Sequence, residues 1–157
     1  MNKEALRQFL QQANKEGYGS GKEQNWKKEE DGSTTITFEF GDFKVHDNFF
    51  GGEPYAGREV IFYKGKPFWM MVYYGAAIEG QDRKRIYALI QKALSNAPAE
   101  MPVRGPRELE DRELTYENGW SGDIQDFSGQ ESIVHKKGQT VYKAKYMGGL
   151  VDQRKEN

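Results

Sequence analysis

Cysteine is absent from this chain of 157 residues. Its absence excludes disulfide bridges, thiolate metal ligands and cysteine nucleophiles, and it is compatible with a reducing cytoplasm. A surplus of either charge is absent as well, because 23 Lys and Arg residues stand against 24 Asp and Glu residues. The net charge of −1 provides no general attraction to nucleic acid or to an anionic membrane. We therefore expect no direct binding to nucleic acid.

Long apolar segments are also absent. The longest nearly apolar run covers residues 67–78, whereas a membrane-spanning helix needs about 20 apolar residues. The first residues include Glu4 and lack the apolar core of a signal peptide. We expect a cytoplasmic protein without a membrane partner. The length favours one domain over residues 1–157, with a polar tail at 152–157.

Catalytic and phosphate-binding motifs are absent too. The glycine-rich residues 17–22 fail the P-loop pattern, because Glu16 stands where its first glycine belongs and Glu23 stands where Ser or Thr belongs. No G-x-S-x-G nucleophile elbow occurs. His46 lies close in sequence to several carboxylates, but a zinc site usually needs more imidazole or thiolate ligands. We predict no catalytic residues, no metal and no cofactor.

Two stretches have the apolar spacing of amphipathic helices. The first covers residues 3–15. The second begins after Asp82, a good N-cap, and ends at residues 96–98. Residues 97–113 contain prolines and alternating charges, and we predict that they form a connector on the surface.

Segments with the alternation or apolar content of strands surround the second helix. They cover residues 34–40, 43–46, 58–63 and 68–74, and then residues 113–117, 131–135 and 140–147. The turns between neighbouring strands, such as 64–66, are too short for a parallel crossover. We therefore predict antiparallel pairing.

The sequence YAGRE at residues 55–59 has a counterpart, FSGQE, at residues 127–131. Downstream, the turn at 64–66 matches 137–139, and YYG at 73–75 matches YMG at 146–148. This pattern predicts an internal repeat over about residues 42–79 and 114–152. We expect an α+β fold, with antiparallel β-sheets in two related half-domains and with the N-terminal and connecting helices packed on them.

The segments FGGEPYAGRE (50–59) and GKPFWMMVYYG (65–75) resemble the signature of a bacterial family, the domain of unknown function 5680. VRGP (103–106) and YMGG (146–149) extend the resemblance. It implies no particular chemistry. Family members often follow a helix-turn-helix, which implies a sensory or regulatory role in those fusions. Here a single predicted helix precedes the strands, too little for such a DNA-binding unit.

Each copy of the repeated motif ends in a glutamate, Glu59 or Glu131. These carboxylates either satisfy backbone donors and neighbouring bases, or both face one shared cavity. Arg58 offers a fork suited to a carboxylate or phosphate. The candidate ligand-binding residues are Tyr55, Arg58, Glu59, Trp69, Tyr73 and Glu131.

Three functions remain open from the sequence. The favoured one is a non-enzymatic small-molecule-binding or regulatory domain, because no catalytic set is recognisable and aromatic residues are abundant. The second is a protein–protein interaction module, including a homodimer formed through an edge strand. The third is an unrecognised hydrolase or isomerase that uses Glu59 and Glu131 as paired carboxylates.

Overall fold

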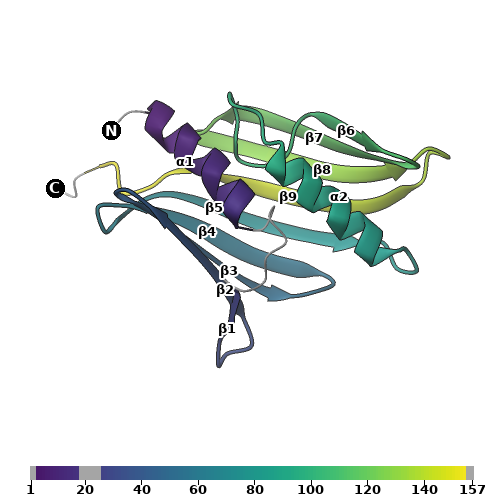
Figure 1. Ribbon diagram of the computed structural model, residues 1–157, viewed down its shortest axis with the longest axis horizontal. Coiled ribbons are helices and arrows are strands. Elements are labelled where there is room, and N and C mark those ends of the chain that lie inside the picture. The colour runs from purple at the N-terminus through teal and green to yellow at the C-terminus, as the bar shows by residue number, and fades with distance from the viewer. Residues whose placement is uncertain (1–2, 18–25, 155–157) are drawn as a thin grey trace.

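The computed structural model describes residues 3–17 and 26–154. Within these residues, nine strands form one antiparallel sheet in the order β1-β2-β3-β4-β5-β9-β8-β7-β6. Two helices, α1 (Lys3–Glu16) and α2 (Arg83–Ser95), lie side by side on the same face of this sheet (Figure 1). The strands are β1 (Trp26–Lys28), β2 (Thr34–Phe40), β3 (Phe43–Gly51), β4 (Tyr55–Tyr63), β5 (Lys66–Ala77), β6 (Glu108–Asp111), β7 (Leu114–Asp123), β8 (Asp126–His135) and β9 (Thr140–Leu150).

The predicted α+β class and antiparallel pairing are confirmed. The strands before and after α2 join in one continuous sheet, because β5 pairs with β9 along its length. Tyr73 and Tyr146, which belong to the two copies of the sequence pattern, are direct partners at this junction. The two segments therefore meet at the centre of the sheet.

Several strands are longer than the sequence predicts. β3 continues to Gly51, β7 continues to Asp123 and β8 begins at Asp126, whereas the sequence placed strands only at 113–117 and 131–135 in this region. These stretches contain glycines and polar residues, which are poor strand formers on their own. Pairing with neighbours on both sides overrides that weak preference. The short strands β1 and β6 were not predicted, and the predicted loop at 18–22 lies outside the described residues.

The core lies between the helices and one face of the sheet. The apolar stripe of α1 is buried against residues such as Ile61 and Trp69. The stripe of α2 is buried against Ile133 and Tyr142. Burial of each large apolar side chain stabilises the fold by roughly 1.5–3 kcal/mol. No helix among the described residues is long and apolar enough to cross a membrane.

The connector after α2 differs from the prediction. We expected residues 97–113 on the surface, but Met101 and Val103 are only 3% and 2% exposed. The amide of Asn14, on α1, donates a hydrogen bond to the Pro102 carbonyl at 2.8 Å. The prolines and charges of this segment therefore do not keep it in solvent, because Met101 and Val103 are buried in the core that α1 covers. This inward course brings Arg104 under the helices.

A tyrosine ring lies directly over Gly129, on β8. A Cβ atom at this position would overlap the ring of Tyr146, which is 4% exposed and has little room to move. We expect Gly129→Ala to lower the free energy of unfolding by about 1–3 kcal/mol, the usual cost of overpacking. The control is Gly119→Ala on β7, where a Cβ meets nothing within 4 Å. Urea titrations that find equal stability for both variants would contradict this packing.

Candidate functional site

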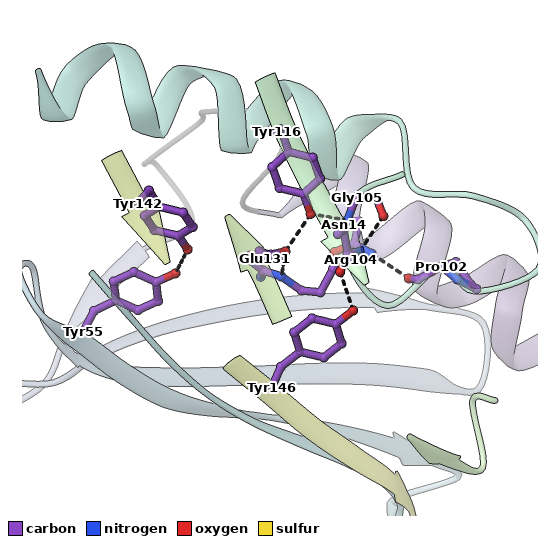
Figure 2. Close-up of polar contacts among 10 residues, drawn as sticks. Asn14, Tyr55, Pro102, Arg104, Gly105, Tyr116, Glu131, Tyr142 and Tyr146 are labelled. Carbon is purple, nitrogen blue, oxygen red and sulfur yellow. Dashed lines mark hydrogen bonds and ion pairs between the residues drawn. The ribbon is translucent and has the colours of Figure 1, made fainter. Parts of the chain in front are cut away.

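A buried ion pair joins the connector to the sheet. Arg104 donates from Nε to Oε1 of Glu131 at 2.6 Å and from Nη2 to Oε2 at 2.9 Å, in a two-pronged arrangement. The Tyr116 hydroxyl also donates to Oε1 of Glu131, at 2.8 Å (Figure 2). Burial alone would lower the pKa of Arg104, but the Glu131 carboxylate raises it well above the ordinary value. Both charges are therefore retained and matched inside the fold.

Further hydrogen bonds extend this arrangement on either side. The Tyr146 hydroxyl donates to Oδ1 of Asn118 at 2.7 Å, and Nδ2 of Asn118 donates to the Gly105 carbonyl at 2.8 Å. The Gly105 amide donates to the Tyr116 hydroxyl at 3.1 Å. Buried polar groups are costly unless they are paired, and here each one named has a partner.

A related set of residues occupies the strands before α2. Asp47 on β3 is the direct partner of Glu59 on β4, just as Asn118 on β7 is the direct partner of Glu131 on β8. The Tyr73 hydroxyl donates to Oδ1 of Asp47 at 2.5 Å. The Tyr146 hydroxyl makes the same bond to Asn118.

The two sets differ in how the glutamate is satisfied. Glu131 accepts three hydrogen bonds, whereas Glu59 receives no hydrogen bond or ion pair from the described residues. Glu59 is nevertheless half-buried, in the wall of a cavity. Burial and the neighbouring Asp47 carboxylate raise the pKa of Glu59 from 4.5 to about 8.

The same surroundings also raise the pKa values of Asp47 and Tyr73. Burial raises the pKa of Asp47 from 3.8 to about 6, although the Tyr73 hydrogen bond and the Arg104 charge act in the opposite direction. Burial and the adjacent Asp47 carboxylate also raise the pKa of Tyr73. Since the pKa of Glu59 is raised further than that of Asp47, the pair of carboxyl groups favours a shared proton near neutral pH.

Glu59 and Asp47 face a cavity of about 340 Å³. Its polar part includes these two carboxyl groups together with Arg104, and its walls include aromatic and aliphatic side chains from the sheet and both helices. Other described residues that line it are Ala13, Asn14, Gly17, Trp26, Lys28, Ile36, Val45, Phe49, Gly51, Gly52, Tyr55, Tyr73, Tyr87, Ile90 and Leu94. The volume is within the usual range for small-molecule sites, near its lower end.

The turn between β3 and β4 is held against α2 beside this cavity. The Glu53 carboxylate accepts a hydrogen bond from the Ala77 amide at 2.7 Å and from the Tyr87 hydroxyl at 2.9 Å. The hydroxyl groups of Tyr55 and Tyr142 also contact each other (Figure 2). These bonds fix one wall of the cavity to the scaffold.

The candidate residues from the sequence fall in three places. Tyr55, Glu59 and Tyr73 line the cavity. Glu131 does not line the cavity and is bound to Arg104, which does. Arg58 is exposed on the opposite face of the sheet, because successive strand residues point to opposite sides.

Trp69, the sixth candidate, is fully buried in the core. Its indole Nε1 donates to the Ile124 carbonyl at 2.7 Å, and its ring stacks on Phe127. Sequence reasoning missed Asp47 and Arg104 as members of this site. Arg104 lies in the VRGP segment that supported the family resemblance. This segment was the one feature of the sequence that could have pointed to Arg104 as a site residue.

His46 lies close in sequence to several carboxylates. Within residues 3–17 and 26–154, no group of three or more His, Asp or Glu side chains is placed to hold a metal ion. His46 and Asp47 are neighbours on β3, so they point to opposite faces of the sheet.

The fold and site define an α+β protein in which two helices cover one face of an antiparallel sheet and enclose a cavity with acidic groups. Residues 47–151 match the profile of a family described as a domain of unknown function, DUF5680. Because the match covers more than half of the chain, the chain belongs to this family. No curated protein and no solved structure matches the chain. Asp47, Glu59, Arg104 and Glu131 all lie within the matched region.

The two glutamates should respond oppositely to removal of their charge. A carboxyl group whose pKa rises on folding stabilises the fold at low pH and loses that contribution as pH rises, here between 4.5 and about 8. Glu59→Gln cannot ionise, so its stability relative to wild type should grow across this window, at up to about 1.4 kcal/mol per pH unit.

Glu131→Gln is the matched comparison. It leaves the Arg104 charge buried without its carboxylate, so we expect a loss of about 3–5 kcal/mol at every pH in this range. Urea unfolding of both variants and wild type at pH 5, 6.5 and 8 measures the two effects. Parallel pH profiles for wild type and Glu59→Gln would show that Glu59 is not held in a raised-pKa environment.

Proposed function

We propose that this protein is a cytoplasmic, non-enzymatic small-molecule-binding domain whose ligand occupies the cavity at Glu59. The observation that carries the proposal is the Glu59 carboxyl group, which faces the cavity and receives no hydrogen bond from the described residues. Glu59 is half-buried in the wall of the cavity, and a carboxyl group with restricted access to water and no protein partner is costly. A ligand that completes its hydrogen bonding would remove that cost.

The surroundings of Glu59 support a binding role. Asp47 is fixed by Tyr73, and Arg104 is fixed by Glu131, so the polar groups of the cavity are already oriented. Preorganised groups bind a ligand with less loss of conformational entropy. The aromatic and aliphatic walls would enclose the apolar part of that ligand.

The arrangement gives less support to a hydrolase or isomerase that uses Glu59 and Glu131 together. Glu131 is engaged by Arg104 and Tyr116, and it is not among the residues that line the cavity at Glu59. A carboxylate held in this way is a poor general base, because the Arg104 charge and three hydrogen bonds stabilise its ionised form against taking up a proton.

We also propose that the two halves arose from one repeated unit and that the domain acts as a sensor in the regulatory fusions of its relatives. The repeat proposal is supported by the matching strand pairs Asp47–Glu59 and Asn118–Glu131. In a sensor, the ligand would change the stability of the domain, and this change would reach the fused partner.

A ligand screen with two variants tests the binding proposal. A compound at 100 times its Kd stabilises the native protein by about 2.7 kcal/mol. We expect active compounds in a metabolite thermal-shift screen to raise the Tm of wild type and of Arg58→Ala, which alters the opposite face. The same compounds should not stabilise Glu59→Gln. A ligand response that survives in Glu59→Gln would place the binding site elsewhere.

A second candidate function is self-association through the uncovered face of the sheet. Tyr74 and Met147 are each 58% exposed there, next to Phe50 and Val72. Exposed apolar patches often mark protein contacts. The edge strands β1 and β6 have only three and four residues and include charged side chains, which disfavours pairing through an edge.

Sedimentation equilibrium tests this second candidate. If copies associate through the patch, wild type is dimeric at a protein concentration about 100-fold above the dimer Kd, and Tyr74→Lys is monomeric at the same concentration. The mass of Glu59→Gln should equal that of wild type, since Glu59 points to the other face. A monomeric wild type at millimolar concentration would exclude self-association.

A further inference from the structure

The second half of the sheet shows what satisfies a glutamate at this position of the fold. Glu131 lies beside Asn118, which accepts from Tyr146, and the Arg104 guanidinium closes the set with two parallel hydrogen bonds. This arrangement matches the planar fork of a guanidinium to the two oxygens of a carboxylate.

The strands before α2 contain a corresponding set of residues, but no guanidinium group from the described residues binds its glutamate. Glu59 lies beside Asp47, which accepts from Tyr73. Tyr116, which donates to Glu131, lies two residues before Asn118 on β7. The residue two positions before Asp47 on β3 is Val45, which has no hydroxyl group and lines the cavity.

We propose that the ligand carries a guanidinium or amidinium group, which binds Glu59 as the Arg104 side chain binds Glu131. This inference rests on the proposed function, because it assigns a chemical class to the ligand of that same cavity. The carboxyl oxygens of Glu59 accept two parallel hydrogen bonds from the cation. Asp47 supplies a second negative charge beside it.

The remaining walls indicate the rest of the ligand. Trp26, Phe49 and Tyr87 line the cavity with Ile90 and Leu94, so the cation is attached to a compact apolar or aromatic group. Aromatic faces also attract organic cations. A cavity of about 340 Å³ admits one such group rather than an extended chain.

The charged groups around the cavity favour a ligand that carries a single positive charge. Apart from Glu59, the ionisable groups lining the cavity in the described part of the chain are Lys28, Asp47, Tyr55, Tyr73, Tyr87 and Arg104. The Arg104 charge is matched by Glu131, whereas the Lys28 ammonium donates to the neutral Thr34 hydroxyl and keeps its positive charge. Two ionised carboxylates, Asp47 and Glu59, together with Lys28 therefore leave one negative charge at the cavity for the ligand to match. The free protein carries a proton on Glu59 at neutral pH, since burial and Asp47 raise the pKa of Glu59 to about 8. A bound cation favours the ionised carboxylate, so binding releases this proton and strengthens as pH rises.

Calorimetry with two matched probes tests the inference. Phenethylguanidine is cationic, and phenethylurea is its neutral counterpart of nearly the same shape. At pH 8 we expect the guanidine to bind wild type and Arg58→Ala at least tenfold more tightly than the urea. We expect Glu59→Gln to weaken guanidine binding at least tenfold. Between pH 6 and 8, guanidine affinity should rise at least tenfold, with proton release measured from titrations in two buffers of different ionisation enthalpy.

Asp47→Asn tests the pH dependence of guanidine binding, which would not change if Asp47 had only a structural role. The variant gives the first half the amide–glutamate pair of the second half, and asparagine still accepts from Tyr73. Removal of the Asp47 charge lowers the pKa of Glu59. Guanidine binding should persist, and the rise in affinity should move to lower pH.

The outcomes separate this inference from the proposed function. If phenethylurea binds as tightly as the guanidine and Glu59→Gln weakens both, the cavity binds ligands but their cationic class is wrong. The same conclusion follows if only neutral or anionic compounds from the screen bind in a Glu59-dependent way. If neither the probes nor any screened compound binds wild type, both proposals fail.

Discussion

The interior of this protein depends on how two glutamates are neutralised, the buried Glu131 and the half-buried Glu59. Glu131 is held by the Arg104 guanidinium, and this ion pair fixes the segment after α2 against the middle of the sheet. The pair also orients Arg104 toward the cavity, where its charge acts on Asp47 and Glu59. Removal of either partner would leave a charge buried without compensation, so the position of the connector and the polarity of the cavity depend on one contact.

The equivalent carboxyl group in the first half is satisfied differently. Glu59 keeps a proton near neutral pH because burial and the adjacent Asp47 carboxylate disfavour its ionised form. An apolar residue at position 59 would avoid this cost, so stability alone does not explain the presence of a glutamate there. The contrast between Glu131 and Glu59, within one sheet and with the same tyrosine hydrogen bond beside each, is the basis for the proposed binding site. Raised carboxyl pKa values in cavities are frequent at functional sites.

The sequence predicted those parts of the fold that local patterns control. The apolar stripes identified α1 and α2, and short turns identified antiparallel pairing. The extents of β7 and β8 could not be predicted, because Gly119 and Gly129 are poor strand formers and only their pairing partners keep them extended. For the site, the repeated motif identified Glu59, Tyr55 and Tyr73. Arg104 was missed because its role depends on a long-range approach of the connector, and the outward direction of Arg58 depends on which strand face is covered.

The proposed site depends on a half-buried Glu59 carboxyl group whose hydrogen bonding a cationic ligand would complete. Carbon-13 NMR titration of glutamate side-chain carboxyl groups, with the Glu59 signal assigned from Glu59→Gln, measures its pKa directly. The account predicts a midpoint near pH 8 in the free protein and a fall of at least one pH unit with saturating phenethylguanidine. A midpoint near 4.5, or a raised midpoint that the guanidine leaves unchanged, would contradict it.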